Sequence, residues 1–190
     1  MSHKLKILLD LDGVICNFNF AACKLANYEL TQENKNWLME DRNRSPEDNL
    51  KKRDKSISFY KLIDKAGIGF WENLELFPWA HYLVETCLSF DRAQLAFCSS
   101  YGPWACGATG KVLFKNRHFP KIPLILTREK ELCAHSNSML IDDYPKKIEK
   151  FRNAGGAFFL WPNQYLLEDR VDLRGGAILD LSLVIRAFLD

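Results

Sequence analysis

Five short apolar runs recur along the chain, each bounded by polar or turn-forming residues. They read KLKILL, AQLAFC, IPLIL, SMLI and AFFLW, at residues 4–9, 93–98, 122–126, 138–141 and 157–161. Runs of this length and composition are typical of buried strands. Stretches with helical periodicity lie between several of them, at residues 78–90, 104–119 and 145–154, and a last one at 180–189 closes the chain. Strands that alternate with helices predict an α/β fold, with a parallel sheet covered by helices on both faces.

One long segment interrupts this alternation. Residues 18–39 and 56–66 have helical patterning, and no buried strand is evident from residue 18 to residue 76. In residues 40–55, 11 of 16 side chains are charged, six positive and five negative, which predicts a solvated helix or loop. We therefore predict an α/β core, residues 1–17 and 77–190, and a small helical cap, residues 18–76, inserted after the first strand.

Composition narrows the class of protein. The length of 190 residues suits one domain with a small insertion, and an aromatic content of 13% suffices for a core and a pocket lining. The net charge of +2 lacks the basic excess usual in nucleic-acid-binding domains, so we expect a small-molecule ligand and no long nucleic acid. No apolar run approaches the roughly 18 residues that span a bilayer. The six cysteines form no CxxC pair, and we expect them to be reduced and buried in a cytoplasmic protein with no membrane partner.

Four of the predicted strands end in residues that can carry chemistry. In strand order these are Asp10 and Asp12, Ser99 and Ser100, Arg128 and Lys130, and Asp142 and Asp143. Taken singly, such residues also fit turns and helix starts, because Asp-Gly favours turns and Ser is a common N-cap. The carboxyl ends of parallel strands meet at one edge of a sheet, however, so all four sets converge. Carboxylates that suit Mg²⁺ and cations that suit phosphate would then meet at one point.

This ordered set resembles the haloacid dehalogenase (HAD) superfamily of phosphatases over nearly the whole chain. The superfamily's DxDG motif matches residues 10–13, and its later motifs match Ser99, Lys130 and the pair Asp142 and Asp143. Finer features are similar to the 5′(3′)-deoxyribonucleotidases, namely DLDGVICNF, Gly69-Phe70-Trp71, Cys98-Ser99-Ser100, ILTREK and the basic residue Lys111. Two positions depart from that pattern, since Asn17 replaces a usual acid and Ser99 a usual threonine. The resemblance implies a Rossmann-like, HAD-type sheet with a cap.

The resemblance also implies a reaction and its residues. It implies that Mg²⁺ is the cofactor and that (deoxy)nucleoside monophosphates are hydrolysed through an aspartyl-phosphate. Asp10 would be the nucleophile, Asp12 the general acid and base, and Ser99 and Lys130 the groups that hold the phosphoryl oxygens. The metal would be held by Asp10, the backbone carbonyl of Asp12, and Asp142, and Asp143 would orient metal-bound water or Lys130. The substrate contacts implied are Phe18, Phe70, Trp71, Ser100, Lys111 and Arg128, with the three aromatic rings forming a slot for the base, and a homodimer is implied.

Other interpretations remain open from the sequence. The same chemistry would act on a sugar phosphate or on a polynucleotide 3′ phosphate. A non-catalytic nucleotide-binding module predicts a damaged Asp10, Asp12, Lys130 or acid pair, and all of these are intact. The sequence leaves open the sugar, the base and the position of the phosphate.

Overall fold

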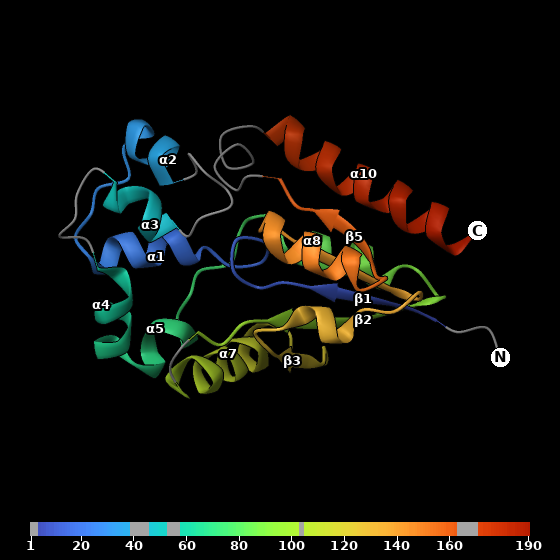
Figure 1. Ribbon diagram of the computed structural model, residues 1–190, viewed down its shortest axis with the longest axis horizontal. Helices are drawn as coiled ribbons and strands as arrows, with labels where there is room; N and C mark the ends of the chain where they lie inside the picture. The colour runs from blue at the N-terminus through green and yellow to red at the C-terminus, as the bar shows by residue number, and fades with distance from the viewer. Residues whose placement is uncertain (1–3, 39–45, 53–57, 103–104, 163–170) are drawn as a thin grey trace. The chain divides into compact units, whose positions relative to one another are not determined.

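The computed structural model describes residues 4–38, 46–52, 58–102, 105–162 and 171–190. It contains a parallel sheet of five strands in the order β3-β2-β1-β4-β5 (Figure 1). The strands are β1 (Leu5–Leu9), β2 (Ala93–Ser99), β3 (Leu124–Leu126), β4 (Ser138–Asp142) and β5 (Ala157–Leu160). The five predicted strands are thus confirmed within one or two residues. Because β1 is central, with β2 and β4 on either side, the ends of these three strands are neighbours.

The chain divides into two compact units. Unit 1 comprises Met1–Cys16, Leu76–Ser100 and Lys121–Asp190, and unit 2 comprises Asn17–Glu75 and Tyr101–Pro120. Besides the sheet, unit 1 contains α6 (Ala80–Leu88), the 3-10 helix η1 (Lys130–Cys133), α8 (Pro145–Asn153) and α10 (Val171–Leu189). Unit 2 contains the segment predicted as a cap and also residues 101–120, which the sequence assigned to the core. The predicted core and cap boundaries stay a proposal.

The core of unit 1 is built on alternation along the strands. Leu8, Cys98 and Leu140 share one face of the sheet and pack with Ile148 and Phe151 of α8. The alternate strand residues are also buried, as expected for strands covered on both faces, and they include Ile7, Leu9, Phe97, Met139 and Ile141. Helix α6 packs against β2, and α10 packs against α6. The predicted α/β fold with flanking helices is confirmed.

The last helix is the longest of those described. Helix α10 has 19 residues, nine more than the sequence pattern at 180–189 indicates. Its side chains Leu181 and Ile185 are fully buried, whereas Leu179 and Leu183 are exposed. Within the described ranges, no helix, α10 included, is both long and apolar enough to cross a membrane.

Unit 2 is helical. It contains α1 (Phe18–Leu25), α2 (Gln32–Leu38), α3 (Pro46–Lys51), α4 (Phe59–Ala66), α5 (Ile68–Glu72) and α7 (Ala105–His118). Asn17 caps α1, because its side chain accepts a hydrogen bond from the Phe20 N–H at 3.1 Å. The prediction of one helical stretch over 18–39 is wrong, since residues 26–31 separate two helices and Asn27 has a φ of 51°. An αL residue interrupts a right-handed helix.

A glycine brings two helices of unit 2 together. Gly110 on α7 lies against α5, where a Cβ would come within 2.4 Å of Trp71 Cβ and 2.8 Å of the Ile68 carbonyl oxygen. Any larger residue at this position would force the two helices apart. The sequence pattern predicted α7 but not this contact, which links residues 101–120 to the rest of unit 2.

The charged run at 40–55 is only partly described, because residues 40–45 and 53–55 lie outside the described ranges. Its described part contains α3, where Glu47 and Asn49 are buried. Glu47 accepts a hydrogen bond from the Tyr60 N–H, in the first turn of α4, at 3.0 Å and also pairs with Lys51. A carboxylate at a helix N-terminus is stabilised by the unpaired N–H groups there. The prediction of a solvated segment is therefore wrong for Glu47 and Asn49.

The cysteines are thiols, and the prediction that all of them are buried is wrong for Cys106 and Cys133, which are half-buried. All six are free, and Cys16, Cys23, Cys87 and Cys98 are buried. Burial raises the pKa of Cys23, Cys87 and Cys98 to about 12. These groups are therefore packing residues that hold their protons at neutral pH.

Candidate active site

The site begins where β1 ends. Asp10 follows the strand directly, and its N–H donates to the Ile141 carbonyl of β4 at 2.9 Å. The Leu11 N–H donates back to Asp10 Oδ1 at 2.8 Å, which holds the carboxylate against its own backbone. The chain then turns, and the Cys16 N–H donates to the Leu11 carbonyl at 2.9 Å. Asp12 is half-buried on this turn, with Cys16 Sγ 3.6 Å from its Oδ1.

A buried lysine joins two of the predicted acids. Lys130 opens η1, and its Nζ lies 2.8 Å from Asp10 Oδ1 and 2.7 Å from Asp142 Oδ2. The Lys130 and Asp142 side chains are 1% and 0% exposed. Burial disfavours the ammonium, but the two carboxylates outweigh it and hold the pKa of Lys130 above its usual range. Burial raises the pKa of Asp142, and the Lys130 charge opposes that rise.

Asp143, the second acid of the pair, can approach the same site because residue 13 is a glycine. A Cβ on Gly13 would lie 2.1 Å from Asp143 Oδ2, and the φ of Gly13 is +78°, which side chains rarely adopt. Only glycine therefore lets Asp143 approach the turn after β1. Asp10, Asp142 and Asp143 each offer an oxygen, and these oxygens lie within 4.8 Å of one another. Three carboxylates beside one ammonium leave excess negative charge, which fits a hard divalent cation.

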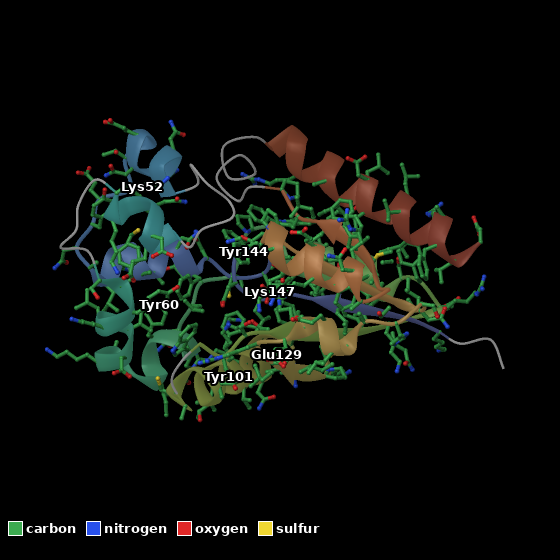
Figure 2. All side chains as sticks on the ribbon, in the orientation of Figure 1. Lys52, Tyr60, Tyr101, Glu129, Tyr144 and Lys147 are labelled. Carbon is green, nitrogen blue, oxygen red and sulfur yellow. The ribbon has the colours of Figure 1, made fainter. Side chains whose placement is uncertain are left out.

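The end of β2 adds two hydroxyls. Ser99, the last residue of the strand, is fully buried, and Ser100 is half-buried. Lys147 on α8 donates from Nζ to Ser100 Oγ at 3.0 Å and to the Arg128 carbonyl at 2.6 Å. Figure 2 shows Lys147 at the start of α8, beside Tyr144. The Arg128 side chain is exposed, and its backbone carbonyl is the part of the residue that accepts the bond from Lys147. Lys147 was not predicted from the sequence, because no motif marks that position.

The predicted aromatic contacts lie together in unit 2. Phe18 stacks on Trp71 with ring centroids 5.5 Å apart, and Phe70 meets both rings edge-on at 5.7 and 5.2 Å. The buried Lys111 places its Nζ 5.0 Å from the centroid of the Trp71 ring. The three rings therefore contact one another as one cluster. The role predicted for these four residues stays a prediction.

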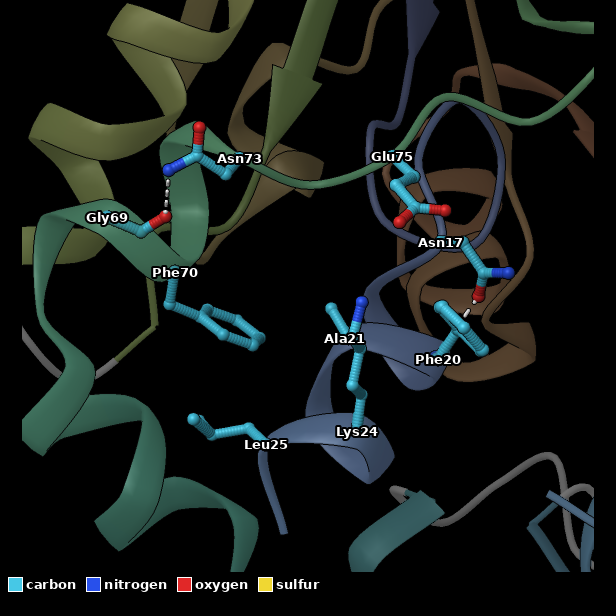
Figure 3. A pocket seen from close by; sticks show the side chains of 9 residues that line it. All are labelled: Asn17, Phe20, Ala21, Lys24, Leu25, Gly69, Phe70, Asn73 and Glu75. Atoms are coloured by element: carbon cyan, nitrogen blue, oxygen red, sulfur yellow. Dashed lines mark hydrogen bonds between the residues drawn. The ribbon is translucent and has the colours of Figure 1, made fainter. Parts of the chain in front are cut away.

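A cavity of about 400 Å³ lies beside this ring cluster, within unit 2. Phe20, Ala21 and Leu25 of α1 form one apolar wall, and Phe70 of α5 points in from the other side (Figure 3). Asn73 closes one edge by donating from Nδ2 to the Gly69 carbonyl at 2.8 Å. Phe70 thus belongs to both the ring cluster and the cavity wall.

Known structures share the fold. A hydrolase from Streptococcus pneumoniae TIGR4 superposes with a TM-score of 0.55 at 14% identity, covering 90% of this chain and 99% of that one. A conserved haloacid dehalogenase-like protein from Agrobacterium tumefaciens C58 gives 0.52 at 13% identity, over 97% and 99%. A haloacid dehalogenase-like family protein from Streptococcus pneumoniae gives 0.52 at 14% identity, over 83% and 84%. These likenesses define the class as a HAD-type α/β fold.

The sequence of the chain assigns the family within that class. The profile of the family "5′ nucleotidase, deoxy (pyrimidine), cytosolic type C protein" matches residues 4–179. The chain belongs to this family, so the resemblance to HAD nucleotidases is confirmed. No curated protein sequence matches the chain. The protein is a phosphoric monoester hydrolase of the nucleotidase type, and its substrate is a small-molecule phosphate.

Proposed function

We propose that the protein hydrolyses deoxynucleoside monophosphates with Mg²⁺ as cofactor, through an aspartyl-phosphate formed on Asp10. The observation that carries this proposal is the buried contact of Lys130 with Asp10 and Asp142. This contact holds the Asp10 carboxylate at the end of β1, next to the Lys130 ammonium, which can donate a hydrogen bond to a phosphoryl oxygen. The family match supports the nucleotide as substrate.

The metal would be held by Asp10, Asp142 and the backbone carbonyl of Asp12. Asp143 lies within the same acidic cluster and would act as a further ligand or hold a water molecule. When bound, Mg²⁺ would reduce the repulsion between a carboxylate and a phosphate dianion. Hard oxygen donors and the excess negative charge of the cluster both support this assignment.

The first step transfers the phosphoryl group to the protein. A carboxylate oxygen of Asp10 attacks phosphorus, and the bond from phosphorus to the ester oxygen breaks. The bonds from Lys130 Nζ and the Leu11 N–H, both 2.8 Å long, fix the carboxylate before attack. Ser99 and Lys130 would hold the non-bridging oxygens, over which the transition-state charge is spread.

The second step returns Asp10 to its free form. Asp12 would already have given its proton to the departing ester oxygen in the first step, so that the nucleoside left as an alcohol, and it enters the second step as a carboxylate. It then takes a proton from water, whose oxygen attacks phosphorus while the bond to Asp10 breaks and phosphate leaves. Asp12 is half-buried, so water can reach it, as a residue that exchanges a proton twice requires.

A substrate panel tests the proposal. Phosphate release is measured for the 5′- and 3′-monophosphates of deoxy- and ribonucleosides, for sugar phosphates and for a 3′-phosphorylated oligonucleotide. We expect the highest kcat/KM on a deoxynucleotide. A higher kcat/KM on a sugar phosphate or on the oligonucleotide would contradict the substrate assignment but not the proposed reaction mechanism.

Removal of the metal is expected to stop turnover. Protein dialysed against EDTA should release no phosphate, and added Mg²⁺ should restore the rate. Mg²⁺ should also raise the melting temperature, because a cation that binds only the folded state stabilises it by about 2.7 kcal/mol at 100 times its Kd. Asp142→Asn should reduce that shift, whereas Asp91→Asn, on an exposed turn of the same unit, should leave it intact. Full turnover in EDTA would rule out the metal assignment.

The remaining predictions follow from the family. We propose a cytoplasmic location, which the cytosolic type of the matching family supports. The homodimer implied by the resemblance stays a prediction, and sedimentation of the purified protein tests it.

A further inference from the structure

Lys147 lies near Lys130 at a half-buried position, where a second positive charge is energetically costly. It occupies the first turn of α8, where its N–H donates to the Tyr144 carbonyl at 3.0 Å, four residues after Asp143. Its side chain is half-buried, and burial lowers its pKa, as does the nearby charge of Lys130. A cation in such a position must be compensated by strong hydrogen bonds. The two bonds from Lys147 Nζ, to Ser100 Oγ and to the Arg128 carbonyl, supply them.

The first of these bonds sets the direction of the Ser100 hydroxyl. An ammonium group has donors and no acceptor, so Ser100 Oγ must accept the bond from Lys147. The hydrogen of that hydroxyl therefore points away from Lys147. A hydroxyl arranged in this way is suited to donate to an oxygen of a bound phosphate.

The second bond holds the loop that carries Lys130. The Thr127 N–H donates to the Ser99 carbonyl at 3.1 Å, and the Glu129 N–H donates to Thr127 Oγ1 at 3.0 Å. Lys147 fixes the intervening Arg128 carbonyl at 2.6 Å, two residues before Lys130. The ends of β2 and β3 are thus tied to the helix that follows the acid pair.

We infer that Lys147 is a positioning residue for the phosphatase reaction, which orients the Ser100 hydroxyl and holds the loop before Lys130. The inference rests on the proposed function, because it assigns to Ser100 a hydrogen bond to the phosphoryl group. Lys147 acts through Ser100 and the loop, and the charge that meets the substrate is that of Lys130.

The test is a double-mutant cycle on the full-length enzyme with Mg²⁺. Lys147→Met should lower kcat about tenfold with KM changed by less than about twofold, since one charge-assisted hydrogen bond is lost. Lys147→Arg, which keeps a cationic donor, should recover most of that loss. Lys146→Met makes the same charge change at the exposed neighbour on the same helix and should leave kcat unchanged.

The cycle separates positioning from the alternatives. In the Ser100→Ala background, Lys147→Met should change kcat by less than about threefold, because coupled residues are not additive. An undiminished loss in that background would mean that Lys147 does not act through Ser100, and a rise in KM instead of a fall in kcat would mean that Lys147 binds the substrate directly. Either result would overturn the inference. A wild-type rate for Lys147→Met would also overturn it. Failure of the wild-type enzyme to release phosphate from any substrate would instead refute the proposed function.

Discussion

Asp10→Asn should abolish phosphate release. The amide is a poor nucleophile, and loss of the group that forms a covalent intermediate costs about a millionfold in comparable cases. Hydrolysis of phosphate monoesters without a catalyst is among the slowest reactions known, so little background rate would remain. The measurement is phosphate release from a deoxynucleotide and from para-nitrophenyl phosphate. Activity above about a tenth of the wild-type rate would exclude Asp10 as the nucleophile.

Two comparisons make this result specific. Asp91→Asn, the same chemical change at an exposed position, should keep wild-type activity. The Asp10→Asn protein should also unfold cooperatively, because asparagine is nearly isosteric with aspartate and Asp142 still pairs with Lys130 at 2.7 Å. Loss of the cooperative melting transition in Asp10→Asn would contradict this expectation and assign Asp10 a role in folding.

Substitution of Asp12, the proposed general acid and base, should give a complementary result. Para-nitrophenolate leaves without a proton, so Asp12→Asn should still form the aspartyl-phosphate from that substrate and then stall. Acid quenching with radiolabelled substrate should therefore trap label on Asp12→Asn and none on Asp10→Asn. Label on Asp10→Asn would place the covalent step on another residue.

Lys130→Met should remove both activity and stability. Lys130 is 1% exposed and lies between two carboxylates, so its loss leaves buried negative charge without a partner. Breaking a buried ion pair by removing one member costs about 3–5 kcal/mol. The measurement is unfolding by denaturant in the presence of EDTA, so that no bound cation replaces the ammonium. Lys121→Met, at an exposed position of unit 1, should leave the unfolding free energy unchanged.

The loss of stability should depend on pH in a defined direction. Burial raises the pKa of Asp142 and Lys130 opposes that rise, so removal of Lys130 should raise the pKa of Asp142 further. A carboxyl with a raised pKa in the folded state stabilises that state at low pH, and this contribution is lost as pH rises through the folded pKa. The loss of unfolding free energy caused by Lys130→Met should therefore be smaller at pH 5 than at pH 8. An equal deficit at both would show that packing, and not charge, is lost.

Much of this architecture can be predicted from the sequence. Short apolar runs indicate the strands, because strands that are covered on both faces of a parallel sheet are apolar along their length. Pro145 indicates the start of α8, because a residue in the first turn of a helix needs no N–H for the helical hydrogen bonds. The residues proposed to react were also predictable, since Asp10, Lys130 and Asp142 lie at or just after the ends of strands, and these ends must meet at one edge. Their convergence depends only on parallel pairing, which the alternation of strands and helices already predicts.

Other features depend on contacts between distant residues, which no local pattern contains. Ser100 and Lys147 are 47 positions apart, and their bond forms only because β2 and α8 belong to one folded unit. Glu47 is buried because Tyr60 presents an N–H to it, although its own neighbours are charged. Local sequence thus determined the strands, several of the helices and the residues proposed to react. Tertiary packing determined which polar groups are buried together, because the cost of burying a charge is offset only by a partner that folding brings near.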